Sequence, residues 1–246
     1  MLGRTLLRWG MAAAALAGLV LSPGCLAPSR MPPEKAFALS ASALSGRDGY
    51  SYAGEWAAFG ADGAALGGAS YRGLVSGHRP IVLQWDGPGG AGGGQGHHPL
   101  ALAEAAQLQA SEIAYAPPPS RDTVAFRIAV RPEAARRAIA EPLRRQMEEA
   151  RRSLNARIDP SRENDRNPRA KAFRALGRSE AELEERLASL EASTVFTWIA
   201  DKRTWFPKEL REETELRYEA DGKERRERRT SVTIFRKGGS GDTMGS

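Results

Sequence analysis

The sequence is poor in the residues that build disulfide-linked or metal-bound scaffolds. Its 246 residues include one Cys and three His. A single Cys excludes an intramolecular disulfide framework and a four-Cys metal cage, and three His argue against a multi-His metal centre. Gly and Pro, with 26 and 15 residues, are too few for a fibrous or fully disordered chain. The remaining composition, 41% apolar and 27% charged, is that of an ordinary globular domain.

The sequence also lacks an apolar run long enough to cross a bilayer. The longest, Met11–Leu21, has 11 residues, whereas a transmembrane helix needs about 20. Arg4 and Arg8 precede this run, and no acidic residue occurs before Glu34. A basic start followed by a short apolar core predicts a secretory signal peptide over residues 1–24. We therefore expect an exported protein with a soluble body.

The segment Leu21-Ser-Pro-Gly-Cys25 follows the apolar core and resembles the lipobox of bacterial lipoproteins. In that family the signal is cleaved before the Cys, which then carries acyl chains such as palmitate. The resemblance implies lipidation at Cys25, a tether over residues 25–33 and anchoring at the extracytoplasmic face of a bacterial membrane. Each buried acyl CH₂ contributes about 0.8 kcal/mol, so several chains would hold the domain there. The alternative is an ordinary signal peptide with an incidental Cys.

Alternating apolar and aromatic patterns predict a largely antiparallel sheet. The expected strands cover residues 50–59, 69–78, 80–85, 122–130, 195–200, 205–220 and 224–236, and two short helices cover 34–43 and 100–109. Strands grouped apart from helices predict an α+β fold.

The last two strands should form a hairpin at Asp221-Gly222. A two-residue loop would pair Leu210 with Thr233 and turn Val232 and Ile234 away from the core. A three-residue loop with a bulge would pair Leu210 with Val232 instead. Because this second register buries the apolar residues, we favour it.

The middle of the chain predicts a helical block over residues 132–193. An apolar stripe recurs at helical spacing from Ile139 to Ile158, and Pro142 is expected to start or kink a helix there. Residues 161–169 predict a loop. Ser179-x-x-Glu182 predicts a capping box that begins a second helix.

The segment Thr197-Trp-Ile-Ala-Asp-Lys-Arg-Thr-Trp-Phe-Pro-Lys-Glu-Leu210 is similar to the late hairpin of LolA-like extracytoplasmic lipoproteins of bacteria, a group that includes LppX-like proteins. The resemblance implies a curved antiparallel sheet, an incomplete β-barrel, with helices packed on its concave side. It would cover residues 34–237, followed by a tail over 238–246 whose small polar residues predict disorder. It further implies a hydrophobic cavity between sheet and helices, used in some members to carry lipids or lipoprotein acyl chains. It implies no catalysis and no cofactor.

Six aromatic residues are candidates to line the implied cavity: Trp56, Tyr71, Trp85, Phe126, Trp198 and Trp205. The alternative is that they form an ordinary core, because aromatic side chains dominate ordinary cores too.

Four Arg residues of the helical block are candidates for contact with an anionic surface: Arg144, Arg145, Arg151 and Arg152. The two pairs lie about two helical turns apart and would line one flank of a helix. Anionic lipid head groups or wall polymers would be their partners, with solvated charge as the alternative. Nucleic acid is not expected as a partner of an exported protein.

Motifs for catalysis are incomplete. Gly87-Pro-Gly-Gly-Ala-Gly92 matches Gly-x-Gly-x-x-Gly but lacks the βαβ unit of a dinucleotide site. His97 and His98 have no evident third metal ligand. We therefore expect a non-enzymatic lipoprotein that holds or shuttles a lipid or other apolar ligand. The alternative is an envelope interaction, sensor or assembly protein of the same fold, without a ligand, that uses the Arg-rich helical surface.

Overall fold

The computed structural model describes residues 31–86, 99–157 and 166–238. Along the chain its elements are α1 (Pro33–Ser45), β1 (Gly49–Gly60), β2 (Ala65–Ser76), β3 (Arg79–Asp86), α3 (Pro99–Gln109), β4 (Ala110–Ala116), β5 (Thr123–Val130), α4 (Pro132–Arg157), α5 (Arg166–Ala188), β6 (Glu191–Asp201), β7 (Pro207–Ala220) and β8 (Lys223–Lys237). The expected signal peptide, Cys25, the Gly-rich motif, His97 and His98, and residues 239–246 lie outside the described residues.

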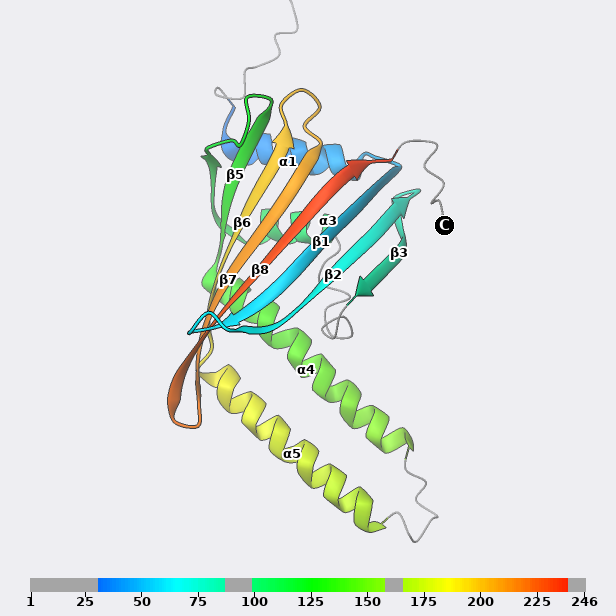
Figure 1. The fold of residues 1–246 in the computed structure, drawn as a ribbon, viewed down its shortest axis with the longest axis vertical. Coiled ribbons are helices and arrows are strands. Elements are labelled where there is room, and N and C mark those ends of the chain that lie inside the picture. The colour runs from blue at the N-terminus through cyan, green and yellow to red at the C-terminus, as the bar shows by residue number, and fades with distance from the viewer. Residues whose placement is uncertain (1–30, 87–98, 158–165, 239–246) are drawn as a thin grey trace, which may run out of the picture.

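The strands form one open sheet in the order β3-β2-β1-β8-β7-β6-β5-β4. Every neighbouring pair is antiparallel. The sheet is curved, and α1 and α3 lie against one of its faces, which we call the inner face (Figure 1). The predicted α+β class with a curved open sheet is therefore confirmed. None of the helices in the described ranges is long and apolar enough to span a bilayer.

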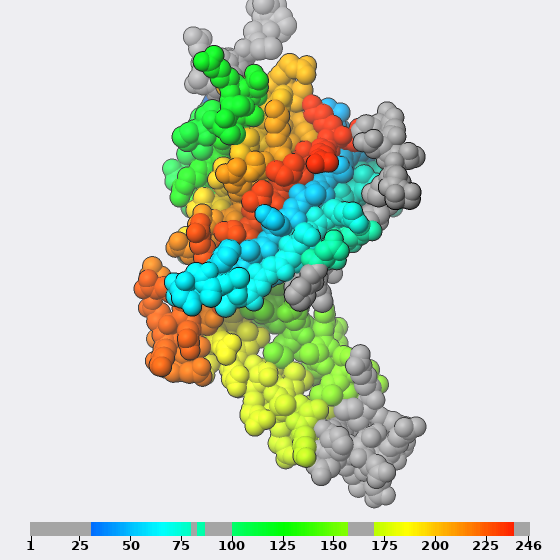
Figure 2. All heavy atoms as spheres, in the orientation of Figure 1, coloured from blue at the N-terminus to red at the C-terminus, as the bar shows by residue number. Residues whose placement is uncertain are grey.

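The helices α4 and α5 form a hairpin that extends beyond the sheet (Figures 1 and 2). Helix α4 continues through Pro142, so this residue does not start a helix. Ala138, whose carbonyl the missing Pro142 N–H would have bonded, is exposed, and water satisfies such a carbonyl. Helix α5 begins at Arg166 and runs through Ser179. The prediction of a capping box at Ser179-x-x-Glu182 and of a loop reaching residue 169 was therefore wrong.

Strand β4 was not predicted from the sequence. It follows α3 without a loop and pairs with β5 at the edge of the sheet. Its sequence, Ala110-Ser-Glu-Ile-Ala-Tyr-Ala116, is rich in Ala, which is depleted in strands, so its propensity was too weak to indicate one.

The β7–β8 hairpin has the register that we did not favour. Ala220 pairs with Lys223 and Leu210 pairs with Thr233. Asp221 and Gly222, the two loop residues, have φ of 54° and 67°. Positive φ at both positions defines a tight turn whose twist matches that of the strands, and this local preference prevails over the apolar pattern. As a result, Thr233 faces inward.

Past the end of β1, β7 and β8 continue as a two-stranded ribbon. Gly60, the last residue of β1, pairs with Glu227, so residues 218–226 pair only within the hairpin. The ribbon carries charged side chains, and Arg226 forms an ion pair with Glu224 at 2.6 Å. Nearby, Arg228 of β8 forms another with Glu213 of β7 at 2.6 Å.

Two hydrophobic clusters cover the inner face. The first core cluster joins α1 and α3 to the sheet and includes Phe37, Leu44, Tyr52, Tyr71, Phe126, Phe196, Trp198, Leu210 and Phe235. The second core cluster lies under the helical hairpin and consists of Ala135, Ala140, Leu187, Leu190, Ala192 and Leu216. Both clusters use residues of β6 and β7, at different heights along these strands.

A buried serine fastens α1 to the β6–β7 hairpin. Trp198 Nε1 donates a hydrogen bond to Ser40 Oγ at 2.8 Å, and Ser40 Oγ donates to the carbonyl of Trp205 at 2.6 Å. Trp205 has φ of 60°, and its N–H bonds the carbonyl of Asp201 at 2.8 Å. The Asp201 carboxylate accepts bonds from the N–H and hydroxyl of Thr204 at 2.9 and 3.0 Å. The Trp-rich motif thus builds a turn that presents a carbonyl to α1.

Two glycines make room for tyrosine rings on the inner face. Tyr52 pairs with Gly73 and Tyr71 pairs with Gly54 across β1 and β2. A Cβ on Gly73 would overlap the Tyr52 ring, and a Cβ on Gly54 would overlap the backbone carbonyl of Val232 and come within 2.6 Å of Tyr71 Cζ. Each ring therefore covers the glycine opposite, which lets two large side chains lie flat on adjacent strands.

Replacing Ser40 with Ala should lower the free energy of unfolding by about 1–3 kcal/mol, because the Trp198 N–H and the Trp205 carbonyl would both lose their buried partner. Urea denaturation at equilibrium measures this loss. Ser42→Ala, on the exposed side of the same helix, is the matched control and should change stability by less than about 0.5 kcal/mol. Equal effects of the two variants would show that the Ser40 bridge contributes nothing.

Gly54→Ala should destabilise the fold by about 1–3 kcal/mol, since the new methyl group meets a backbone carbonyl that cannot move without breaking the β1–β8 pairing. In Gly67→Ala the methyl group would lie 3.8 Å from its nearest neighbour, Trp56 Cη2, which is ordinary contact. Thermal melting of both variants compares them. If Gly54→Ala and the control Gly67→Ala have the same melting temperature, the close packing at Gly54 is wrong.

Candidate functional site

The six aromatic residues expected to line a cavity lie on or beside the inner face. Tyr71, Phe126 and Trp198 are 0–2% exposed within the first core cluster, and Trp85 and Trp205 pack against it. Phe37 of α1 contacts Trp198 edge-on, with ring centroids 5.4 Å apart. Five of the six are thus brought together, and at Trp198 and Phe126 the space above the ring is taken by α1. Trp56, further along β1, is only partly buried.

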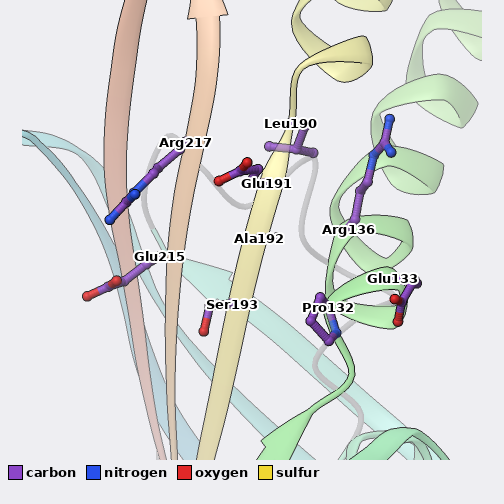
Figure 3. Close-up of a pocket in the computed structure, with 9 residues that line it drawn as sticks. All are labelled: Pro132, Glu133, Arg136, Leu190, Glu191, Ala192, Ser193, Glu215 and Arg217. Atoms are coloured by element: carbon purple, nitrogen blue, oxygen red, sulfur yellow. The ribbon is translucent and has the colours of Figure 1, made fainter.

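None of these six aromatics lines either of two pockets that the described residues form at the helical hairpin. The larger, of about 480 Å³, lies where β6 begins beside α4 (Figure 3); its lining residues are Pro132, Glu133, Arg136, Leu190, Glu191, Ala192, Ser193, Glu215 and Arg217. The charges of this lining are mixed. Arg136 is already engaged, because it donates to the carbonyl of Leu187 at 2.8 Å at the end of α5. A smaller pocket lies between α4 and α5.

The four candidate Arg residues of α4 divide into two kinds. Arg144 forms a two-pronged ion pair with Glu184 of α5, at 2.8 and 2.7 Å, and this pairing raises the pKa of Arg144. Arg151 pairs with Glu180. Arg145 and Arg152 are exposed and have no partner in the described part of the chain. Only these two would be free to meet an anionic surface.

Between the two core clusters, the inner face carries polar side chains instead of apolar ones. On β7, Leu210 belongs to the first cluster and Leu216 to the second, and the two inward positions between them are Glu212 and Thr214. The same change occurs on the neighbouring strands. We call the resulting set the polar belt: Trp56 of β1, Thr194 of β6, Glu212 and Thr214 of β7, and Arg229 and Ser231 of β8.

The strand register brings the polar belt together in two rows. Trp56 pairs with Ser231, which pairs with Glu212. In the next row Arg229 pairs with Thr214, which pairs with Thr194. Residues directly opposite on one face of an antiparallel pair have Cβ atoms about 5 Å apart, so each row is a line of contacting side chains. Tyr71 borders the belt, with its hydroxyl 2.5 Å from Thr233 Oγ1.

Glu212 is the acid at the centre of the belt. Burial raises its pKa above the ordinary value of 4.5, and hydrogen bonds from Thr214 and Ser231 and the charge of Arg229 oppose this rise. The Thr214 hydroxyl lies 3.3 Å from Glu212 Oε1, and the Thr194 hydroxyl lies 2.9 Å from that of Thr214. When Thr214 donates to the carboxylate, it accepts from Thr194. These hydroxyl groups stabilise the charged form of the Glu212 carboxyl group, which burial disfavours.

Two donors in the belt have no acceptor within the described ranges. Trp56 Nε1 and Arg229 Nε are buried atoms without a hydrogen-bond partner. Arg229 uses its Nη2 instead, which lies 3.2 Å from Glu227 Oε2. Buried polar atoms are nearly always paired with protein, water or a ligand. The belt therefore has a capacity to donate hydrogen bonds that the chain itself does not use.

The belt was missed in the sequence because the apolar pattern was used to choose the register. With the observed pairing, Ser231 and Thr233 face inward, while Val232 and Ile234 face outward and Ile234 is 40% exposed. The sequence did contain a signal that could have identified the belt: the turn residues Asp221-Gly222 and the apolar pattern of the strand favour opposite registers. No group of three or more His, Cys, Asp or Glu in the described segments is placed to hold a metal ion.

Glu212→Gln should stabilise the protein more at pH 8 than at pH 4. The pKa of Glu212 is raised in the folded state, so its folded form binds the proton more tightly than the unfolded chain does. Below pH 4.5 the group is protonated in both states and does not lower the free energy of unfolding. As pH rises through the pKa of the folded state, ionisation of the buried group lowers that free energy. Urea denaturation across this pH range measures the difference. Glu213→Gln removes the same charge from the outer face of the same strand; a matching pH trend there would contradict the assignment to Glu212.

No family model matches the chain, and no curated protein is significantly similar to it. The architecture itself, an open, curved sheet of eight antiparallel strands with helices, is compatible with a half-barrel.

Proposed function

We propose that this protein is a cell-envelope lipoprotein with a LolA-like half-barrel, and that it holds or shuttles an amphipathic ligand, a lipid, at its inner face without catalysis. The observation that carries the proposal is the polar belt, in which the buried Nε1 of Trp56 and Nε of Arg229 have no acceptor among the described residues and lie between two apolar core clusters. Buried donors of this kind are usually paired with protein, water or a ligand. A lipid provides both an apolar chain and polar oxygen atoms.

Three belt residues are reachable from outside, which a ligand site requires. Trp56, Glu212 and Arg229 are partly exposed, whereas their cross-strand partners Ser231 and Thr214 are 6% and 1% exposed. A ligand at this place would lie between the two core clusters and cover side chains that are already largely removed from water. The N-terminal sequence supports the same proposal, because a signal peptide and a lipidated Cys25 would place the domain beside a source of lipid.

The proposal is tested by mass spectrometry of the full-length chain purified from a bacterial membrane extract. Under native conditions we expect an additional mass that disappears under denaturing conditions, because the ligand is bound without a covalent bond. Acyl groups on Cys25 would persist under both conditions, and the Cys25→Ser variant should lack them but keep the native addition. This variant therefore separates the anchor from the ligand.

Identical native and denatured masses, together with failure to bind an added fluorescent fatty-acyl probe, would contradict the proposal. The alternative would then be an interaction, sensor or assembly protein of the same fold. The observation that favours it is the helical hairpin, which extends beyond the sheet and presents Arg145 and Arg152, both exposed and without a partner among the described residues.

A further inference from the structure

The polar belt results from a strand register that buries fewer apolar side chains than the alternative register would. The two-residue turn at Asp221 and Gly222 directs Ser231 and Thr233 inward and leaves Val232 and Ile234 on the outer face. The opposite register would bury both aliphatic residues. Positions where local sequence and burial disagree are expected at functional or strained sites. The disagreement therefore points to the belt, and not to the core clusters, as the place where a ligand is recognised.

The unused hydrogen-bonding capacity of the belt is that of a donor. Trp56 Nε1 and Arg229 Nε each carry a hydrogen and no lone pair available to accept one, and neither has an acceptor in the described structure. The register places both residues on the same face, Trp56 in the Trp56–Ser231–Glu212 row and Arg229 in the adjacent row. A ligand that completes the belt must bring oxygen acceptors to this point.

The charges around the belt select the kind of oxygen. Among the described residues of the belt, Arg229 is the cation, and the carboxyl groups of Glu212 and Glu227 lie on either side of it along the inner face. An anionic group entering here would meet two carboxyl groups. The positive charge of Arg229 would not attract it strongly, because Arg229 is already paired with Glu227. A cationic group would be repelled by Arg229, which lies between the two carboxyl groups and is paired with Glu227. Glu212 itself offers oxygen atoms to a hydroxyl group.

From these contacts we infer that the polar belt is a head-group subsite for an uncharged, oxygen-rich head group that carries ester and hydroxyl groups, as an acylglycerol does. The indole N–H of Trp56 and the guanidinium of Arg229 donate to ester oxygens, and Glu212 accepts from a hydroxyl group. Charged head groups on the same acyl chain bind more weakly. This inference rests on the proposed function and specifies the ligand class of the same site.

The test uses three probes that share the same monounsaturated hydrocarbon chain and differ in head-group charge: 1-monooleoylglycerol, oleate and oleylamine. Each is titrated against the full-length protein loaded with a fluorescent acyl probe, and displacement gives its affinity. We expect 1-monooleoylglycerol to bind at least tenfold more tightly than either charged probe. Trp56→Phe, which keeps an aromatic ring but removes the N–H, should weaken 1-monooleoylglycerol about five- to tenfold.

A second variant tests the role of charge. Glu212→Gln removes a carboxyl group from the belt, so it should narrow the preference for 1-monooleoylglycerol over oleate. The control Glu213→Gln, one residue away on the exposed outer face, should leave the preference unchanged. Thermal melting of each variant confirms that it is folded before its affinity is compared.

The outcomes separate the two proposals. If all three probes bind equally and neither belt variant changes their order, the head-group subsite is wrong although a lipid-binding function stands. If the fluorescent acyl probe does not bind at all, the proposed function fails and the subsite fails with it. A preference for oleate that Glu212→Gln does not alter would also overturn the inference.

Discussion

The arrangement of this protein depends on one buried hydroxyl group. Ser40 accepts from the indole of Trp198 and donates to the carbonyl of Trp205, and so joins the first helix to a hairpin more than 150 residues later in the chain. With α1 fixed in this way, Phe37 lies against Trp198 and Phe126, and the first core cluster forms around it. The bond needs a carbonyl turned toward the helix, which the positive φ of Trp205 provides. The Trp-rich motif is thus explained by a structural task.

Much of the fold could be predicted from the sequence because its strands alternate clearly. Strands β1, β2, β3, β5, β6, β7 and β8 and helices α1 and α3 lie close to their expected ranges. The incorrect predictions concern features that depend on residues distant in the sequence but close in space. Strand β4 is too rich in Ala to be recognised alone, and its pairing with β5 creates it. Helix α5 continues through Ser179 because a capping pattern does not prevent a helix from extending upstream.

The candidate site was less predictable than the fold. Trp56 and Tyr71 were identified as ligand candidates for their aromatic rings, while Glu212 and Arg229 were not identified at all. Their relevance appears only when the register of β8 is known, since a shift by one residue exchanges every inward side chain for its neighbour. The belt also explains why the two core clusters remain separate. Glu212 and Thr214 occupy the positions on β7 where a continuous core would place apolar residues.

The charged ribbon formed by the ends of β7 and β8 has a consequence for association between copies of this chain. Two strands that extend beyond their sheet expose backbone groups on both sides, and such ribbons are templates for aggregation. Here the exposed surface carries Arg226 and Glu224, and charged side chains on an edge strand discourage pairing with another chain. The ribbon thus extends the sheet while its charges oppose association at its edges.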